Sequence, residues 1–270
     1  MSTDGGLQRQ FYDMLMESQW WSADELRNYQ RSQLSQLLRH AKKNVPFYEH
    51  RLDAVVKANG DIDWDRWGEI PIVKRQDMID HRDAMQATEL PPGHESTTIA
   101  TTSGTSGAPI SVTSTRLAFL ALNGNRYRSY RWHSIDWTDT VCALIAEEAS
   151  VAAWPIGRAD GPWGPAWDLD TLDGMMISIN RLTPMDRLLE FLERKRPAYV
   201  TTGPTRGYAL AVTARRLGAS LKFSAFLPNG EAVTEQVRSA ILDTFGARCI
   251  DLYSSKEAGH IAHLCPQGGG

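Results

Sequence analysis

The amino-acid sequence predicts an α/β fold, in which a helical N-terminal region precedes a largely parallel sheet flanked by helices. Residues 1–95 carry mainly helical patterns. From Met175 onward, short apolar runs alternate with amphipathic segments of helix length. Strands that alternate with helices pair in parallel through right-handed crossover connections. We therefore expect a helical region over residues 1–95 and an α/β region over residues 96–270.

The composition is that of an ordinary soluble globular protein, with 42% hydrophobic and 23% charged residues. A net charge of −3 gives no sign of a nucleic-acid or membrane partner. The polar N-terminus lacks the apolar core of a signal peptide, and no apolar run approaches the roughly 20 residues of a membrane span. Three widely spaced cysteines suggest a reducing compartment rather than a disulfide framework. These features predict a cytoplasmic protein.

The N-terminal region contains recognisable helix signals. Ser22 and Glu25 have the spacing of a capping box, in which each side chain binds a free amide of the first turn. Pro46 should end the helix, because proline donates no hydrogen bond and restricts the residue before it. A second, short helix is expected over residues 75–84. Apolar side chains at helical spacing should form one buried stripe on the first helix: Leu34, Leu37, Leu38 and Ala41.

In the α/β region, Thr183 should cap a helix beginning at Pro184, and Thr234 should cap a later one. Residues 152–167 contain three prolines, three glycines and three tryptophans, which is the composition of a loop. Ligands bind at the carboxyl ends of parallel strands, so the exits after Ala100, Leu227 and Tyr253 are candidate site loops. Strands are expected over residues 97–100, 110–113, 141–146, 176–179, 198–201, 223–227 and 248–253, and further helices over residues 117–130 and 205–217.

The strongest local signal is the loop Thr101–Gly107, which has five hydroxyls and two glycines within seven residues. Glycine lets the backbone approach a ligand closely, and hydroxyls with exposed amides can surround phosphate oxygens. The loop is not a Walker motif, because no Gly-Lys-Ser/Thr follows. A flexible hairpin tip would have the same composition, but the position between two expected strands favours a phosphate loop.

Two further segments carry polar residues at strand ends. The first is Tyr253–Glu257, where a carboxylate could bind Mg²⁺ and an aromatic ring could stack on a base. The alternative is a polar strand exit with a surface Lys–Glu pair, which contributes little energy. The second is the turn that contains Gly230 and Glu231, which could reach a ligand or simply begin the next helix.

Taken together, five segments in one order resemble the adenylate-forming superfamily, and within it the phenylacetate–coenzyme A ligase group. The helical lead-in of that group is resembled by QLSQLLRHAKKNVPFYEHRL and IPIVKRQDM, and its phosphate loop by TTSGTSGAPI. Its acyl-pocket segment is resembled by RPAYVTTGPTRGYALA, and its nucleotide-binding segment by FLPNGEAVTEQVRSAILDTFGARCIDLYSSKEAG.

The resemblance implies a reaction in which ATP activates a small-molecule carboxylate, an aryl or acyl acid, as an acyl-adenylate, and coenzyme A then displaces AMP. It implies that Gly230 and Glu231 border the adenine and acyl pocket, and that Tyr253 flanks adenine beside Ser254 and Ser255. Glu257 would hold Mg²⁺ and, with Lys256, form the catalytic pair. A homodimer is a further expected association. By resemblance, the β- and γ-phosphates would be held by Ser103, Gly104, Thr105, Ser106 and Gly107.

The sequence departs from the family pattern at two positions of the last motif. Ser254 stands where the family usually has glycine, and Lys256 where it usually has Thr or Ser before the glutamate. Lysine meets phosphate as a point charge on a flexible stem, which puts the usual hydroxyl contact in doubt. Nearby His260, His263 and Cys265 could bind zinc, although a structural site uses four ligands and a polar loop is the alternative.

Family members continue beyond the point where this sequence stops, with a ribose-binding aspartate and a small domain that bears a catalytic lysine. The resemblance therefore implies an incomplete large domain that is inactive alone. Two alternatives to the ligase remain open. One is an adenylyltransferase that acts on a cofactor hydroxyl, and the other is a nucleotide- or partner-binding protein without complete activity.

Overall fold

A computed structural model describes residues 3–101, 109–168 and 173–267. The chain forms two compact units, Met1–Tyr12 with Leu122–Gly270 as the first and Asp13–Ala121 as the second. The predicted division after residue 95 stays a prediction. Among the described residues, no helix is long and apolar enough to cross a membrane.

The N-terminal part begins with α1 (Thr3–Ser18) and α2 (Ala23–Asn44). The predicted capping box is confirmed: the Ser22 side chain accepts from the Glu25 amide, and the Ser22 amide donates to the Glu25 carboxylate at 2.8 Å. The predicted stop is also confirmed, since the 3-10 helix η1 (Pro46–Tyr48) follows α2. The second unit also contains η2 (Trp64–Glu69) and α3 (Arg75–Asp80).

The predicted buried stripe on α2 is only partly correct. Leu38 packs in the small core of the second unit, whereas Leu37 is 60% exposed. The reason is that this core is narrow, so it covers one edge of the helix rather than a full apolar face. Its buried members are Leu38, Leu52, Val55 and Val56.

The hydroxyl-rich loop connects the strands of a separate hairpin. Among the described residues, strands β1 (Thr97–Thr101) and β2 (Ser111–Thr115) pair only with each other, in antiparallel orientation. Helix α4 (Arg116–Trp132) follows. The expectation that this loop leaves the parallel sheet is therefore wrong. Consecutive strands joined by a short connection can pair directly with each other, without a helical crossover.

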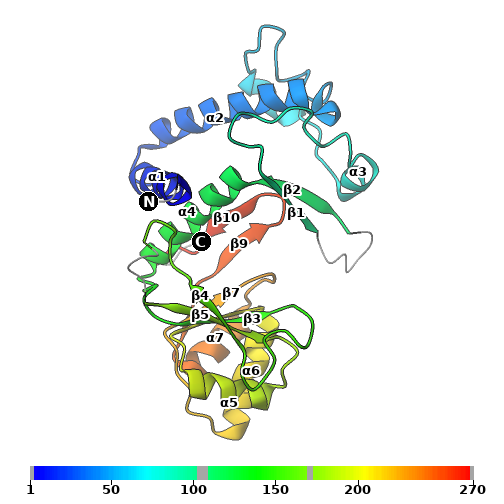
Figure 1. The fold of residues 1–270 in the computed structure, drawn as a ribbon. Helices are drawn as coiled ribbons and strands as arrows, with labels where there is room; N and C mark the ends of the chain where they lie inside the picture. The colour runs from blue at the N-terminus through cyan, green and yellow to red at the C-terminus, as the bar shows by residue number, and fades with distance from the viewer. Residues whose placement is uncertain (1–2, 102–108, 169–172, 268–270) are drawn as a thin grey trace. The chain divides into compact units, whose positions relative to one another are not determined.

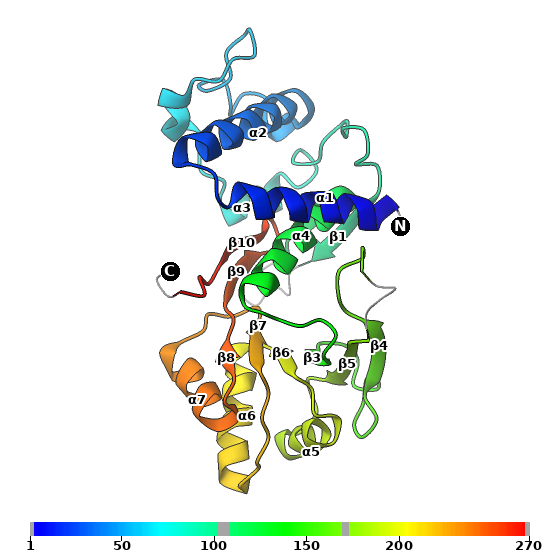
Figure 2. The ribbon, with the colours of Figure 1, turned by 90° about the vertical axis from the view of Figure 1, so that its left-hand side faces the viewer.

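The main sheet has six strands in the order β4-β5-β3-β6-β7-β8, which Figure 2 shows across the first unit. All neighbours are parallel except β4 and β5. This confirms the predicted, largely parallel sheet. The strands are β3 (Val141–Ile145), β4 (Arg158–Pro162), β5 (Met175–Asn180), β6 (Tyr199–Thr202), β7 (Ala225–Pro228) and β8 (Arg248–Cys249).

One face of this sheet is covered by α5 (Met185–Lys195), α6 (Pro204–Leu217) and α7 (Glu235–Phe245), which Figure 1 draws together beneath the strands. Their apolar residues form the largest core cluster with the sheet. Thr234 caps α7 as predicted, accepting from the Val237 amide at 3.3 Å. Thr183 does not cap α5; Pro184 occupies the N-cap position without a side-chain hydrogen bond.

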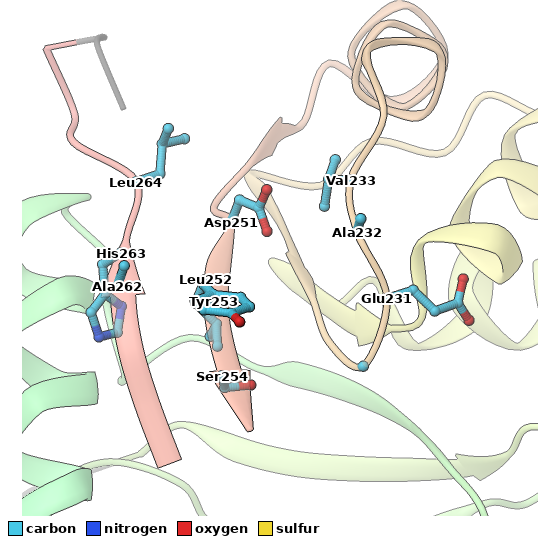
Figure 3. Close-up of a pocket in the computed structure, with 11 residues that line it drawn as sticks. Glu231, Ala232, Val233, Asp251, Leu252, Tyr253, Ser254, Ala262, His263 and Leu264 are labelled. Carbon is cyan, nitrogen blue, oxygen red and sulfur yellow. The ribbon is translucent and has the colours of Figure 1, made fainter. Parts of the chain in front are cut away.

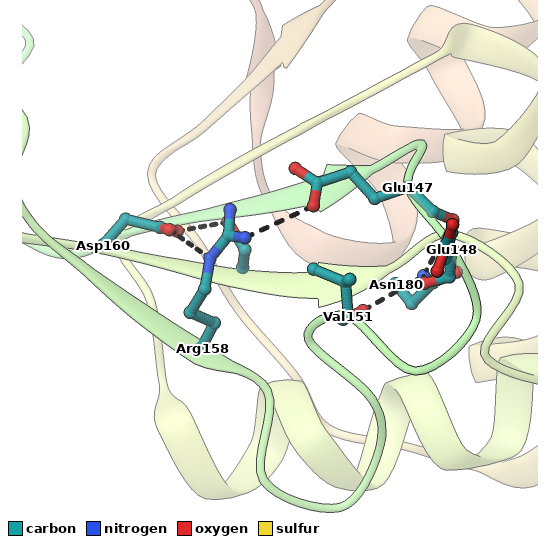
Figure 4. Close-up of polar contacts among 7 residues, drawn as sticks. Glu147, Glu148, Val151, Arg158, Asp160 and Asn180 are labelled. Atoms are coloured by element: carbon teal, nitrogen blue, oxygen red, sulfur yellow. Dashed lines mark hydrogen bonds and ion pairs between the residues drawn. The ribbon is translucent and has the colours of Figure 1, made fainter.

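Strand β4 lies inside residues 152–167, where the composition predicted only loop. Arg158 contacts the Asp160 carboxylate at 2.5 Å and Glu147 at 3.4 Å, and Ser178 of β5 also donates to Asp160 (Figure 4). Asn180 of β5 donates to the carbonyls of residues 147, 148 and 151 and fixes the loop after β3. Side-chain contacts and edge pairing thus hold a strand whose residues have little intrinsic strand preference.

The predicted strand 248–253 is in fact divided. β8 ends at Cys249, and β9 (Leu252–Ser255) belongs to a second two-stranded sheet with β10 (Gly259–His263). The prediction that Tyr253 ends a buried strand is therefore wrong, because its side chain is 67% exposed.

Candidate functional site

A cavity of about 520 Å³ lies between the turn that follows β7 and the β9–β10 hairpin. It brings together four residues that the sequence singled out in two separate motifs, Gly230, Glu231, Tyr253 and Ser254 (Figure 3). Both segments belong to the first unit. The complete lining is Gly230–Val233, Asp251–Ser254 and Ala262–Leu264.

The turn after β7 is fixed by contacts with the neighbouring strand. The Asn229 amide group donates to the Thr201 hydroxyl at 3.0 Å, and the Asn229 backbone N–H donates to the Thr202 carbonyl at 3.2 Å. Gly230 has φ +76, a conformation that costs other residues energy. One rim of the cavity is therefore a preorganised turn at the carboxyl edge of the parallel sheet.

Glu231 lies at the cavity rim, but its carboxylate points away from Tyr253 (Figure 3). It accepts hydrogen bonds from the Thr205 backbone N–H at 3.1 Å and from the Thr205 hydroxyl. An anion at this place stabilises the unpaired amides at the start of α6. A Cβ on Gly203 would lie 2.8 Å from a Glu231 carboxylate oxygen, so glycine leaves room for this contact.

The other rim is the β9–β10 hairpin. Ser255 pairs with Gly259 across a three-residue connection, and the Ser255 hydroxyl accepts from the Ala258 amide at 3.0 Å. Gly259 has φ +67, as expected for the left-handed residue of such a turn, and its Cβ would lie 2.4 Å from Leu122. Conformation and space both require glycine there.

Three predicted residues of the hairpin are open to a ligand. The Tyr253 ring lines the cavity and is mostly exposed, so one face is available for stacking. Lys256 and Glu257 occupy the exposed connection between the strands, and neither has an assigned contact with another described side chain. Glu257 could supply one carboxylate to Mg²⁺, which commonly takes one or two carboxylates and fills its sphere with phosphates and water.

The predicted phosphate-binding residues Ser103, Gly104, Thr105, Ser106 and Gly107 lie outside the described residues. The strands on either side are described, and the Thr101 and Ser111 hydroxyls lie 3.1 Å apart at the base of the loop. Ile110, which follows the loop, is 4% exposed and belongs to the apolar interior.

Asp251 is a cavity residue that sequence reasoning missed. Its carboxylate lies 3.6 Å from the Arg238 guanidinium. Burial raises its pKa, and the arginine opposes that shift. The signal available in the sequence was an acidic residue two positions before the motif tyrosine.

Two of the three candidate zinc ligands lie on a strand rather than in a polar loop. His260 and His263 are on β10 with ring centroids 5.5 Å apart, while Cys265 is exposed beyond the strand. Within the described ranges, no group of three or more His, Cys, Asp or Glu side chains could hold a metal. The geometry therefore adds no support to the zinc hypothesis.

No protein-family model matches this chain, and no curated protein matches it either. Solved structures do share its fold. The open conformation of 2-hydroxyisobutyryl-CoA ligase, in complex with 2-HIB-AMP and CoA, matches with a TM-score of 0.65 and 19% identity over 90% of this chain and 59% of that chain. The same enzyme in its thioesterification state matches with a TM-score of 0.67 and 20% identity, over 90% and 54%.

At this level of identity the likeness establishes a shared fold. The chain spans 59% of the length of the first of these ligase chains. The described residues thus share the fold of one part of that chain.

Proposed function

We propose that this chain is part of an adenylate-forming ligase, which activates a carboxylate with ATP and passes the acyl group to coenzyme A. One observation carries the proposal: two separate motif segments meet around a cavity of about 520 Å³ at the carboxyl edge of the sheet. Edges of this kind bind nucleotides in open α/β folds. The fold shared with a ligase solved with an acyl-adenylate supports it further.

The chemistry follows from the weakness of carboxylates as electrophiles. A carboxylate oxygen attacks the α-phosphorus of ATP, the bond to the bridging oxygen breaks, and pyrophosphate leaves. The thiol of coenzyme A then adds to the acyl carbon and loses its proton, and AMP leaves with the bonding electron pair. Positioning and charge stabilisation dominate such phosphoryl transfers.

The residues of this chain take the following roles. Tyr253 stacks on adenine while the Gly230 turn borders the base, and Ser103–Gly107 binds the β- and γ-phosphates. Glu257 supplies a carboxylate to Mg²⁺, which neutralises phosphate charge when it is bound. Lys256 places a positive charge where the family has a hydroxyl, which would favour an anionic α-phosphate.

We further propose an aryl or acyl acid as the substrate, within a phenylacetate–coenzyme A ligase-like group. The segment around β6 and α6 supports this, because its sequence resembles the acyl-pocket segment of that group. A second candidate is a nucleotide-binding protein without ligase activity. Lys256 is the observation that favours it, since the family's hydroxyl contact is missing there.

The test is acid-dependent exchange of labelled pyrophosphate into ATP, measured beside calorimetric titration with Mg·ATP, on the whole ligase of which this chain is proposed to be a part. The ligase predicts both binding and exchange, with exchange reduced about 100-fold in Glu257→Ala. The control, Glu193→Ala, removes an exposed carboxylate on α5 and should change neither. Binding without exchange would favour the second candidate, and absence of binding would contradict both.

A further inference from the structure

A second cavity, of about 220 Å³, adjoins the first and shares Leu252, Ser254 and His263 with it. Its volume lies below the roughly 300 Å³ at which drug-sized pockets begin, so it suits a small organic molecule. Because the two cavities share wall residues, an acid that reacts with a nucleotide in the first cavity can extend past them into the second. This inference rests on the proposed function.

The lining of the second cavity has an apolar side and a hydrogen-bonding side. The apolar side includes Leu227 of β7 and Ile250, which lies between β8 and β9. The other side comes from α4 and β10, which contribute Arg126, Ser129 and His260. None of the described lining residues is an Asp or Glu.

Several buried nitrogen atoms around this cavity lack a hydrogen-bond partner among the described residues. They include the Arg126 Nε, the His260 Nδ1 and both ring nitrogens of His263. The partner identified for the Arg126 guanidinium is the neutral amide oxygen of Asn123. Buried polar groups are normally satisfied, and a buried cation normally has a counter-anion. The unpaired atoms point to a ligand with acceptor oxygens.

The electrostatics agree with this geometry. Burial, followed by the charges of His260, Arg128 and His133, lowers the pKa of His263 to about 4. Burial lowers the pKa of His260, and the charge of Arg126 contributes a smaller shift in the same direction. Nearby positive groups thus disfavour any additional positive charge, which is the behaviour of a site that attracts anions.

We propose that the substrate acid carries a second anionic group, and that Arg126 together with His260 binds this group in the second cavity. Arg126 and His260 line the second cavity and not the first, so they lie away from the reacting carboxylate. The apolar side, with Leu227 and Ile250, would hold the carbon chain between the two anionic ends. The substrate class is therefore a small dicarboxylic acid rather than a plain hydrocarbon acid.

Glutarate and 5-methylhexanoate form a matched pair of probes, because the second replaces the distal carboxylate with an uncharged group of the same shape. Calorimetric titration without nucleotide should show glutarate binding at least about tenfold more tightly, the scale of a charge-assisted hydrogen bond. Arg126→Met should abolish that preference. Arg216→Met, at an exposed position on α6, should preserve it, and circular dichroism would confirm that each variant is folded.

Three results would overturn the inference. They are equal binding of the two acids by the wild type, an equal loss of both acids in Arg126→Met, or a loss that falls on AMP or pyrophosphate instead of glutarate. The last result would mean that Arg126 binds a nucleotide phosphate. The comparison of glutarate with 5-methylhexanoate in the wild type is enough to decide whether the inference holds. The test therefore still works if the variant does not fold.

The two proposals fail separately. Binding of Mg·ATP without a preference for glutarate would overturn the second-anion inference alone. A preference for glutarate without any binding of Mg·ATP would overturn the proposed ligase function alone.

Discussion

Glu231 connects the proposed nucleotide pocket to helix α6, and its removal should cost measurable stability. Its carboxylate accepts two hydrogen bonds from Thr205, one from the backbone N–H at 3.1 Å and one from the hydroxyl. Hydrogen bonds to charged groups contribute about 1.5–3 kcal/mol, and an anion at a helix N-terminus about 0.3–1 kcal/mol. Because the pair is exposed, we take the low end. Glu231→Ala should lower the free energy of unfolding by about 1–2 kcal/mol.

Urea denaturation followed by circular dichroism measures this change, with Glu193→Ala as the control for loss of an exposed carboxylate. A double-mutant cycle with Thr205→Ala isolates the hydroxyl contact and should give a coupling of about 0.5–1 kcal/mol. A coupling of zero, or equal costs for Glu231→Ala and Glu193→Ala, would refute the assigned contact. Glu231 would then be free to face the ligand, as the family resemblance first suggested.

Three other predictions follow from the same structure. In urea denaturation, the Gly207→Ala variant should be about 1–3 kcal/mol less stable than the Gly6→Ala variant. The reason is that a Cβ on residue 207 would lie 2.5 Å from the buried Phe226 ring, whereas a Cβ on residue 6 would meet nothing within 4 Å. Equal stabilities of the two variants would contradict this packing. Burial raises the pKa of Cys142 to about 12 and of Cys249 to about 11, so below these values both stay thiols. Iodoacetamide near pH 8 should therefore label the exposed Cys265 alone until the protein is unfolded, as mass spectrometry would show; rapid native labelling at a buried cysteine would count against the core. Burial, followed by the charges of nearby groups, lowers the pKa of His263 to about 4 in the folded protein, whereas its pKa is about 6.5 in the unfolded chain. As the pH falls, the unfolded chain therefore takes up a proton at a higher pH than the folded protein does. The free energy of unfolding should fall as the pH drops from about 6.5 to about 4, and it should fall less in His263→Gln. The same pH dependence in that variant and in the wild type would contradict the assignment.

The sequence was sufficient for elements that rest on local rules. The capping box at Ser22 and the stop at Pro46 depend on neighbours within a few residues, and both are present. The alternation of apolar strands and amphipathic helices predicted the parallel sheet. The strands of such a sheet are apolar because helices or other parts of the chain cover both of its faces. These features need no knowledge of distant contacts.

Elements and contacts that depend on partners which no local pattern reveals were not predictable. Strand β10 has histidines and a glycine where a strand pattern would show alternation, and it exists because it pairs with β9. Strand β4 depends on contacts from Arg158 and Ser178 with Asp160. The direction of Glu231 depends on Thr205, which lies 26 residues earlier in the chain. Composition alone cannot reveal such partners.

The central claim is that a nucleotide occupies the cavity between the turn after β7 and the β9–β10 hairpin. Photolabelling with 8-azido-ATP, followed by peptide mass spectrometry, tests it most directly. The account predicts label within residues 229–233 or 251–255, competed by unlabelled Mg·ATP and weakened in Tyr253→Leu but not in Tyr253→Phe, because the phenyl ring still stacks. Label that Mg·ATP competes away but that maps entirely outside these two segments would contradict the account.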